Sequence, residues 1–175
     1  MEIPLTVADH LARAELVYGD RIGVVDEPDQ TAPPMPDLTY RQFAEAARGL
    51  AAGLDGLGLD HGARVAMVSQ NAARMLVFLF GTSAFGRVGV PVNFRLNADE
   101  VQYIVDHSGA EVLLMDPELV DTLGDVAVSQ RFLLGEESDA LIVDDPDPRP
   151  GRPTRTPRRP STTRAAPLLA RRASR

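Results

Sequence analysis

The sequence contains no cysteine and no lysine. Without cysteine, the chain can form no disulfide, no thiolate metal site and no cysteine nucleophile, a composition that fits a cytoplasmic protein. All 18 basic residues are arginine, a bias that suggests GC-rich coding.

Long apolar runs are also missing. The longest uncharged apolar stretch, residues 75–86, has 12 residues, whereas a membrane-spanning helix needs about 20. The first ten residues, MEIPLTVADH, have neither the basic region nor the apolar region of a signal peptide. We therefore predict a cytoplasmic protein without a transmembrane segment.

Charge is divided unevenly along the chain. Residues 1–145 contain 9 arginines against 24 aspartates and glutamates, whereas residues 146–175 contain 9 arginines and one aspartate. Half of the 14 prolines also lie in residues 146–175. Such a composition buries too little apolar surface to fold. We therefore predict a folded body at residues 1–145 and a disordered, basic Arg/Pro-rich tail at residues 146–175.

Within the body, apolar residues at helical spacing alternate with short runs rich in β-branched residues. This alternation is typical of βαβ units, so we predict an α/β fold, a mainly parallel sheet flanked by helices. Residues 118–143 are expected to add a helix and one or two short strands. The predicted helices span residues 6–18, 39–54, 72–85 and 97–107, and the predicted strands span residues 22–26, which we expect to be buried, 64–68, 89–93 and 111–116.

Polar residues that precede the helical patterns are predicted to cap them. Thr39 stands directly before an amphipathic helix, and Asn71 stands directly before an apolar one. Asn97 is followed three residues later by Glu100, which is the spacing of a capping box, and Gly109 is expected to end that helix.

No group of residues indicates a metal site or an acid–base pair. The three histidines are far apart in sequence, and none has a second metal-type ligand at helical spacing, so no metal site is predicted. Adjacent carboxylates point apart on a helix or loop, and we expect them on the solvated surface. The residues considered are His10, His61 and His107, and the pairs Asp99–Glu100, Glu136–Glu137 and Asp144–Asp145.

Two other segments have features of anion-binding sites. The glycine-rich run Gly53–Gly62 follows a helix and precedes a strand, the reverse of the order in a phosphate-binding loop, so we interpret it as a helix end and turn. The basic tail has no aromatic residue to stack on bases and is attached to an acidic body, so no specific nucleic acid is predicted as a partner. We assign no catalytic, cofactor-binding or metal-binding residue in this chain.

Three segments resemble the adenylate-forming superfamily of AMP-dependent synthetases and ligases, in its fatty acyl-CoA synthetase branch. GVPVNFRLNADEVQYIVDHSGAEVLLMD, residues 89–116, is similar to a family strand ending in P-x-N-x-R-L, followed by a helix with YIxxHSGA and a strand with V-L-L. LTYRQFAEAARGLAAGL resembles the early helix of the family, and GARVAMVSQNAARMLVFLFGTSAFGRVGVPVN resembles its next segment. The resemblance covers about residues 6–145.

The resemblance implies an enzyme that uses Mg-ATP to convert a carboxylic (fatty) acid to an acyl adenylate, and then transfers the acyl group to coenzyme A. It also implies that residues 1–145 form an incomplete N-terminal portion of the large domain of the ligase. The phosphate-binding loop of the family, of the type YTSGTTGxPKG, its magnesium and ribose ligands and its catalytic lysine are expected after residue 145. Because the chain has no lysine, we expect no bound cofactor and no activity from this fragment alone.

The tail can be tested against the genetic code. If the third base of each codon from Pro160 onward is joined to the first two bases of the next codon, PSTTRAAPLLARRASR permits the reading INYTSGTTARPKGVQ. This reading contains the phosphate loop of the family. We therefore predict a frameshift near residues 146–150, after which the tail is out of frame.

Two alternatives remain open from sequence. A non-catalytic α/β binding module with an anion-binding basic tail would be monodisperse and would bind nucleic acid in a salt-dependent way. A different nucleotide-dependent α/β enzyme would be stabilised by ATP or NAD, although the chain contains neither of the usual glycine-rich nucleotide motifs.

Overall fold

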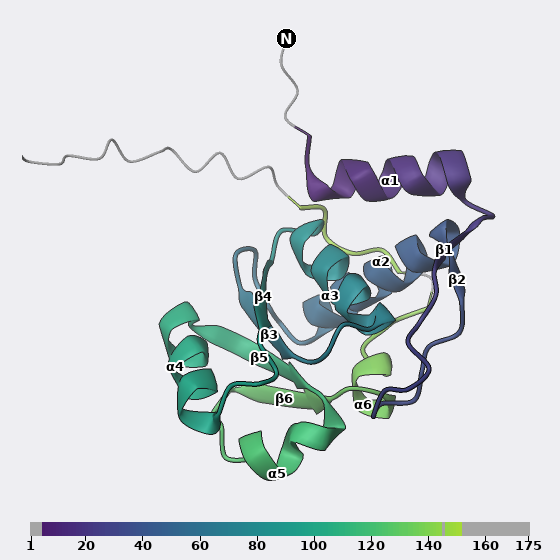
Figure 1. Ribbon diagram of the computed structural model, residues 1–175. Helices are drawn as coiled ribbons and strands as arrows, with labels where there is room; N and C mark the ends of the chain where they lie inside the picture. The colour runs from purple at the N-terminus through teal and green to yellow at the C-terminus, as the bar shows by residue number, and fades with distance from the viewer. Residues whose placement is uncertain (1–4, 145, 152–175) are drawn as a thin grey trace, which may run out of the picture.

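The computed structural model describes residues 5–144 and 146–151. Its centre is a four-stranded parallel sheet with strand order β4-β3-β5-β6, covered by helices on both faces (Figure 1). This architecture confirms the predicted α/β fold. The helices are α1 (Val7–Tyr18), α2 (Tyr40–Gly56), α3 (Ala73–Ser83), α4 (Ala98–Ser108), α5 (Val120–Leu123), α6 (Glu136–Asp139) and the 3-10 helix η1 (Pro117–Leu119), and the strands are β1 (Ile22–Val24), β2 (Leu38–Thr39), β3 (Arg64–Val68), β4 (Val88–Val92), β5 (Ala110–Met115) and β6 (Gln130–Leu133).

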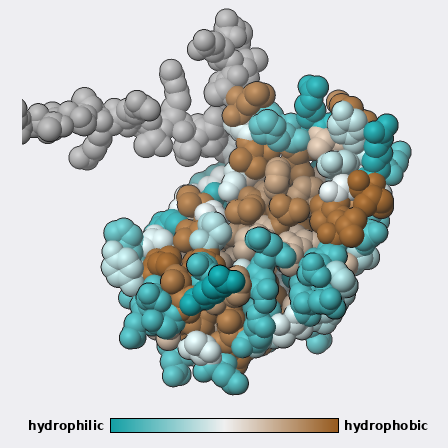
Figure 2. All heavy atoms as spheres, in the orientation of Figure 1, coloured by the Kyte–Doolittle hydropathy of each residue, from teal (hydrophilic) through white to brown (hydrophobic). Residues whose placement is uncertain are grey.

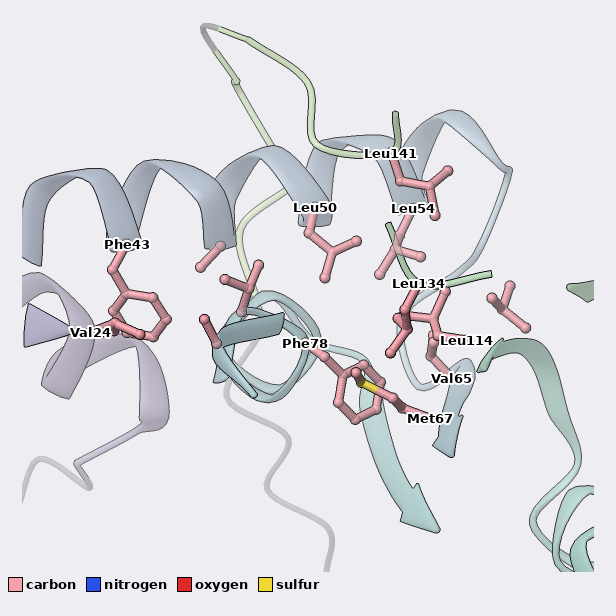
Figure 3. Packing of buried hydrophobic residues seen from close by; sticks show 14 of the residues in the cluster. Val24, Phe43, Leu50, Leu54, Val65, Met67, Phe78, Leu114, Leu134 and Leu141 are labelled. Carbon is pink, nitrogen blue, oxygen red and sulfur yellow. The ribbon is translucent and has the colours of Figure 1, made fainter. Parts of the chain in front are cut away.

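Alternating side chains of β3 divide the core into two layers. Val65 and Met67 point to the face covered by α2 and α3, whereas Ala66 and Val68 point to the face covered by α4 and α5. Figure 3 shows the first layer, where Leu50 and Leu54 of α2 and Phe78 of α3 pack toward the sheet. Because residues 65–68 of β3 and 112–115 of β5 are buried on both faces, these segments have continuous apolar sequences instead of alternating ones.

Local capping signals correctly predicted where two helices begin. Thr39 and Asn97 each accept the backbone N–H three residues later, at 3.2 and 3.0 Å, and both helices have the complete capping box. Gly109 ends α4 in the left-handed conformation, with φ at 64°.

Two of the predictions were wrong. The segment at 22–26 is not a buried strand of the main sheet: β1 pairs antiparallel with β2, and Ile22 is 54% exposed. Asn71 does not cap α3, because the N-cap residue is Ala72 and no side chain in the capping position makes the bond. The carboxylate of Asp26, distant in sequence, accepts the Ala73 N–H at 2.7 Å instead.

The chain continues to contact the body after residue 145. Arg149 donates from its backbone N–H and its Nε to the Asp55 carboxylate, at 2.9 and 2.7 Å, and from its guanidinium to the Leu59 carbonyl. The start of the predicted tail, 146–151, therefore makes specific contacts with the end of α2. Most of the predicted tail, 152–175, lies outside the described residues.

Candidate functional site

The chain diverges to opposite faces of the sheet at the carboxyl ends of β3 and β4. After β3 the chain enters α3 on one face, and after β4 it enters α4 on the other (Figure 1). In open α/β sheets, ligands bind in the crevice that such a divergence leaves between neighbouring strands. This crevice is the candidate functional site.

A hollow of about 360 Å³ occupies the crevice. Its polar groups are Ser69 and Asn71 after β3 and Asn93 after β4, and Met75 and Phe94 contribute apolar surface. No charged side chain lines this hollow. The arrangement combines neutral hydrogen-bonding side chains with apolar surface.

A second hollow of about 380 Å³ lies on the other side of the N-terminal end of α3 and shares Asn71 and Met75 with the first. Its outer wall includes Val25, which is 70% exposed, and Leu76, which is 40% exposed. Figure 2 shows hydrophobic residues gathered over this part of the molecule, which includes α3 and β1. The helix α3 thus has partly exposed apolar side chains on its outer side.

A buried carboxylate lies beside the crevice. Asp116, directly after β5, is 4% exposed, and its Oδ2 accepts the Ser69 hydroxyl at 3.0 Å. Its Oδ1 is buried without a hydrogen-bond partner among the described residues. Burial raises the pKa of Asp116, the Ser69 hydrogen bond opposes this shift, and the nearby Glu118 charge adds to it.

The long loop between β1 and β2 is tied to this end of the sheet. Glu118 accepts hydrogen bonds from Gln70 at 2.8 Å and from Thr31 of the loop at 2.9 Å, and these bonds lower the pKa of Glu118. The buried Arg74 donates to the loop carbonyl of Pro33 at 2.7 Å. The loop therefore covers part of the carboxyl end of the sheet.

Both buried arginines of the described part are already paired. Arg74 forms a bidentate ion pair with Asp139, in which its Nε and Nη2 donate to the two carboxylate oxygens at 2.8 and 2.6 Å. Arg87 donates to Asp55 and to the Leu59 carbonyl. Neither guanidinium is therefore free to hold an anionic group.

The family model for AMP-binding enzymes matches residues 11–169. The chain belongs to this family. The match confirms the resemblance found in the sequence and agrees with the parallel sheet and its helices.

Curated relatives of this chain include CoA ligases. It is 32% identical over 145 residues to a long-chain-fatty-acid–CoA ligase of Thermus thermophilus, covering 78% of this chain and 26% of that protein. It is 35% identical over 111 residues to a feruloyl-CoA synthase of an Amycolatopsis species, covering 63% of this chain and 23% of that protein. The chain therefore spans about a quarter of the length of these relatives.

Solved structures of CoA ligases share the fold. A long-chain-fatty-acid-CoA ligase from Archaeoglobus fulgidus matches 87% of this chain and 33% of its own, with a TM-score of 0.76 and 18% identity. A benzoate CoA ligase from Burkholderia xenovorans matches 86% of this chain and 30% of its own, with a TM-score of 0.69 and 20% identity. At these identities the likeness concerns the fold alone.

The histidines considered from sequence as site candidates lie apart in the structure. His10 and His61 are exposed on α1 and on a loop, and His107 stacks on Tyr103 with ring centroids 5.5 Å apart. In residues 5–144 and 146–151, no three histidine or acidic side chains converge as metal ligands. The same part of the chain contains no helix with the length and apolar character needed to cross a membrane.

Two of the paired carboxylates and the glycine-rich run have local structural roles, and Asp145 lies outside the described residues. Glu100 completes the cap of α4, and Glu137 accepts the Leu133 N–H at 2.8 Å. In the Gly53–Gly62 run, the Leu57 N–H bonds to the Gly53 carbonyl, and Gly58 and Gly62 have positive φ, as expected for a helix end and turn.

Sequence reasoning did not single out Asp116 or Arg74. Asp116 was predicted only as the last residue of a strand, although an acid at the end of an apolar run and before Pro117 is a usable signal. Arg74 interrupts an otherwise apolar helix. Its role could not be predicted from the local sequence, because its partner, Asp139, is 65 positions away.

Proposed function

We propose that this chain is part of an ATP-dependent acid–thiol ligase, which activates a carboxylic (fatty) acid as an acyl adenylate and then forms its coenzyme A thioester. The observation that carries the proposal is the family match over residues 11–169, together with relatives named as CoA ligases. The parent enzyme would use ATP, magnesium and coenzyme A, and we propose a cytoplasmic location for it.

Within this proposal, the described residues form part of the structural framework of the enzyme and do not take part in the reaction. The hollow between β3 and β4 is uncharged, and Arg74 and Arg87 are each paired with a carboxylate. The groups that bind nucleotide and magnesium are therefore expected outside the described residues, and we assign no catalytic role to any residue described here.

We further propose that the chain is catalytically inactive alone because its reading frame is broken near residues 146–150. The support is the alternative reading INYTSGTTARPKGVQ of the codons that follow Pro160, and the absence of lysine from the whole sequence. A glycine-rich backbone and a lysine are the groups that would hold phosphates in such a loop.

Resequencing the gene across codons 140–180, and through several hundred codons downstream, tests the frame break. We expect a single-base insertion or deletion, followed by an open reading frame that encodes TSGTTARPKG and continues beyond it. A confirmed sequence with no continuing frame in the shifted register would reject the proposal.

An assay of acyl-CoA formation then compares the chain as given with the frame-restored product. The frame-restored product should form acyl-CoA from ATP, coenzyme A and a panel of fatty and aromatic acids, and the chain as given should form none. A matched control is the frame-restored product with the lysine of its TSGTTARPKG segment replaced by alanine. Thioester formation by the chain as given would overturn the inactivity proposal, and an inactive frame-restored product would overturn the ligase proposal.

A second candidate is a non-catalytic module that binds anions through its basic segment. It is favoured by the charge division, with 9 arginines and one aspartate in residues 146–175. Nucleic-acid affinity that falls steeply with salt, measured for a monodisperse sample, would support it. Affinity that is unchanged after removal of residues 152–175 would exclude it.

A further inference from the structure

The loop between β1 and β2, residues 25–37, contains no helix or strand. Loops longer than about 12 residues without secondary structure are uncommon and usually have a function, for example as lids. Ala32 is the one residue of this loop that is buried, so few apolar contacts hold it. A segment held in this way opens locally at a low cost in free energy. Its polar attachments therefore decide whether it stays closed.

A chain of hydrogen bonds joins this loop to the buried carboxyl of Asp116. Glu118 accepts from the Thr31 hydroxyl with one oxygen and from the Gln70 side chain with the other, at 2.9 and 2.8 Å. The Ser69 hydroxyl lies 3.0 Å from the Gln70 carbonyl and 3.0 Å from Oδ2 of Asp116. Ser69 and Asp116 are 6% and 4% exposed, whereas Glu118 and Thr31 lie at the surface. The chain thus connects an enclosed carboxyl to the outer loop.

The Ser69 hydroxyl has one hydrogen and faces two acceptors. If Asp116 is ionised, its carboxylate competes with the Gln70 carbonyl for this hydrogen. The buried Oδ1 is then charged, with no hydrogen-bond partner among the described residues. If Asp116 is protonated on Oδ2, it donates to Ser69, and Ser69 donates to the Gln70 carbonyl. The closed arrangement therefore favours the protonated carboxyl.

The charged groups around Asp116 act in both directions. Burial is the largest influence and raises its pKa, the Glu118 charge raises it further, and the Arg74 charge lowers it. Arg74 is itself paired with Asp139 of α6 at 2.6 Å and also feels the charge of Asp26 at the start of the loop. The strongest opposing charge is therefore already engaged by other carboxylates.

We propose that a proton on Asp116 keeps the loop at 25–37 closed over the carboxyl end of the sheet, and that ionisation of Asp116 opens it. Ionisation turns the Ser69 hydroxyl away from the Gln70 carbonyl and places a second negative charge beside Glu118, whose carboxylate holds the loop. Opening lets water hydrate the new carboxylate. Because the closed state binds one more proton, the open state is favoured as pH rises.

The switch would connect pH to access to the crevice. Ser69 lines the hollow between β3 and β4, and Asn71, which follows Gln70, lines both hollows beside α3. A lid at the carboxyl end of a parallel sheet lies where ligands of such folds bind. The inference does not depend on the proposed ligase activity.

A spin label in the loop tests the switch in the full chain. The sequence has no cysteine, so one introduced cysteine is labelled uniquely. Asp29→Cys places the label at an exposed loop position whose carboxylate makes no hydrogen bond among the described residues. As pH rises above about 4, the electron paramagnetic resonance spectrum should gain a mobile component. The ratio of mobile to immobile label should rise by up to about tenfold per pH unit, the limit for release of one proton.

Three variants of the labelled chain separate this switch from general loosening. Asp116→Asn should stay immobile at every pH, because its amide donates to Ser69 and cannot ionise. Thr31→Val, which removes the bond between the loop and Glu118, should raise the mobile component already at low pH. Asp121→Asn removes an exposed carboxylate on α5 and should titrate like the wild type. Circular dichroism verifies that each variant is folded.

The carboxyl carbon of Asp116, followed by nuclear magnetic resonance in the wild type, provides a test that needs no variant. Its titration midpoint should lie above that of the exposed Asp121 and should coincide with the midpoint of loop opening. A midpoint at or below that of Asp121, loop mobility that is constant or falls as pH rises, or an unchanged pH dependence in Asp116→Asn would each overturn the proposal.

Discussion

The carboxylate of Asp26 caps helix α3 by accepting the backbone N–H of Ala73 at 2.7 Å, across 47 positions of sequence. Its other oxygen accepts the Met35 N–H at 2.7 Å, so one side chain joins the loop after β1 to the start of a core helix. The N-cap residue of α3 is Ala72, whose side chain has no atom that can accept a hydrogen bond. A residue far from α3 thus satisfies a backbone donor that would otherwise be unpaired.

Asp26→Ala should lower the free energy of unfolding by about 1–2 kcal/mol, the usual cost of a lost cap. Burial alone would raise the pKa of Asp26, but the N–H donors of Ala73 and Met35 lower it overall. A lowered pKa means that this stabilisation is present above the unfolded-state pKa and is lost as pH falls through the folded-state pKa. Urea unfolding at several pH values measures both effects.

The control for the Asp26 cap is Asp29→Ala, in the same loop. Asp29 is exposed, and its carboxylate makes no hydrogen bond among the described residues. An equal loss of stability in both variants would contradict the cap.

The pH dependence of Asp116 should have the opposite sign. Burial raises its pKa, so the folded state favours the protonated carboxyl, and the resulting stability is lost as pH rises through the folded-state pKa. The stability of Asp116→Asn relative to the wild type should therefore increase as pH rises above the unfolded-state pKa of about 4. Denaturation at each pH measures the difference, with Asp121→Asn at an exposed position of α5 as control. A difference that does not change with pH would refute the raised pKa.

Two glycines of α2 should respond oppositely to alanine. A Cβ at Gly53 would lie 1.9 Å from the Leu141 carbonyl oxygen, so Gly53→Ala should destabilise the protein by roughly 1–3 kcal/mol. Gly56 is exposed and has no atom within 4 Å of an added Cβ, so Gly56→Ala should stabilise it by about 0.5–1 kcal/mol. Thermal melts of both variants test the contact between α2 and the segment at 141–143, and equal shifts would contradict it.

The two arginines that share Asp55 should differ in importance. The side chain of Arg87 is 2% exposed, and its removal leaves Asp55 and a helix end without a buried donor, so Arg87→Ala should cost about 3 kcal/mol or more. The side chain of Arg149 is 46% exposed, and Arg149→Ala should cost less than about 1 kcal/mol. Unfolding of both single variants and the double variant, with the exposed Arg13→Ala as control, measures the coupling. A larger loss for Arg149→Ala than for Arg87→Ala would be the contrary result.

Local patterns determined much of the fold. The strands β3, β4 and β5 lie within one residue of their predicted ends, because continuous apolar runs bounded by turn residues leave few other structures. The caps at Thr39 and Asn97 were predicted for a similar reason, since each hydrogen bond spans three residues. The motif resemblance also indicated the family, and the family match confirms it.

Tertiary structure alone decided the features that join distant segments. The Asp26 cap on α3 and the Ser69–Asp116 hydrogen bond each connect residues 47 positions apart, and no local period encodes such a pair. The strand order β4-β3-β5-β6 placed the crevice between β3 and β4, and the pairing of β1 with β2 removed β1 from the main sheet. The local sequence determined the helices and strands. Which polar groups are enclosed was determined by packing, because the burial of a residue depends on the elements that cover it.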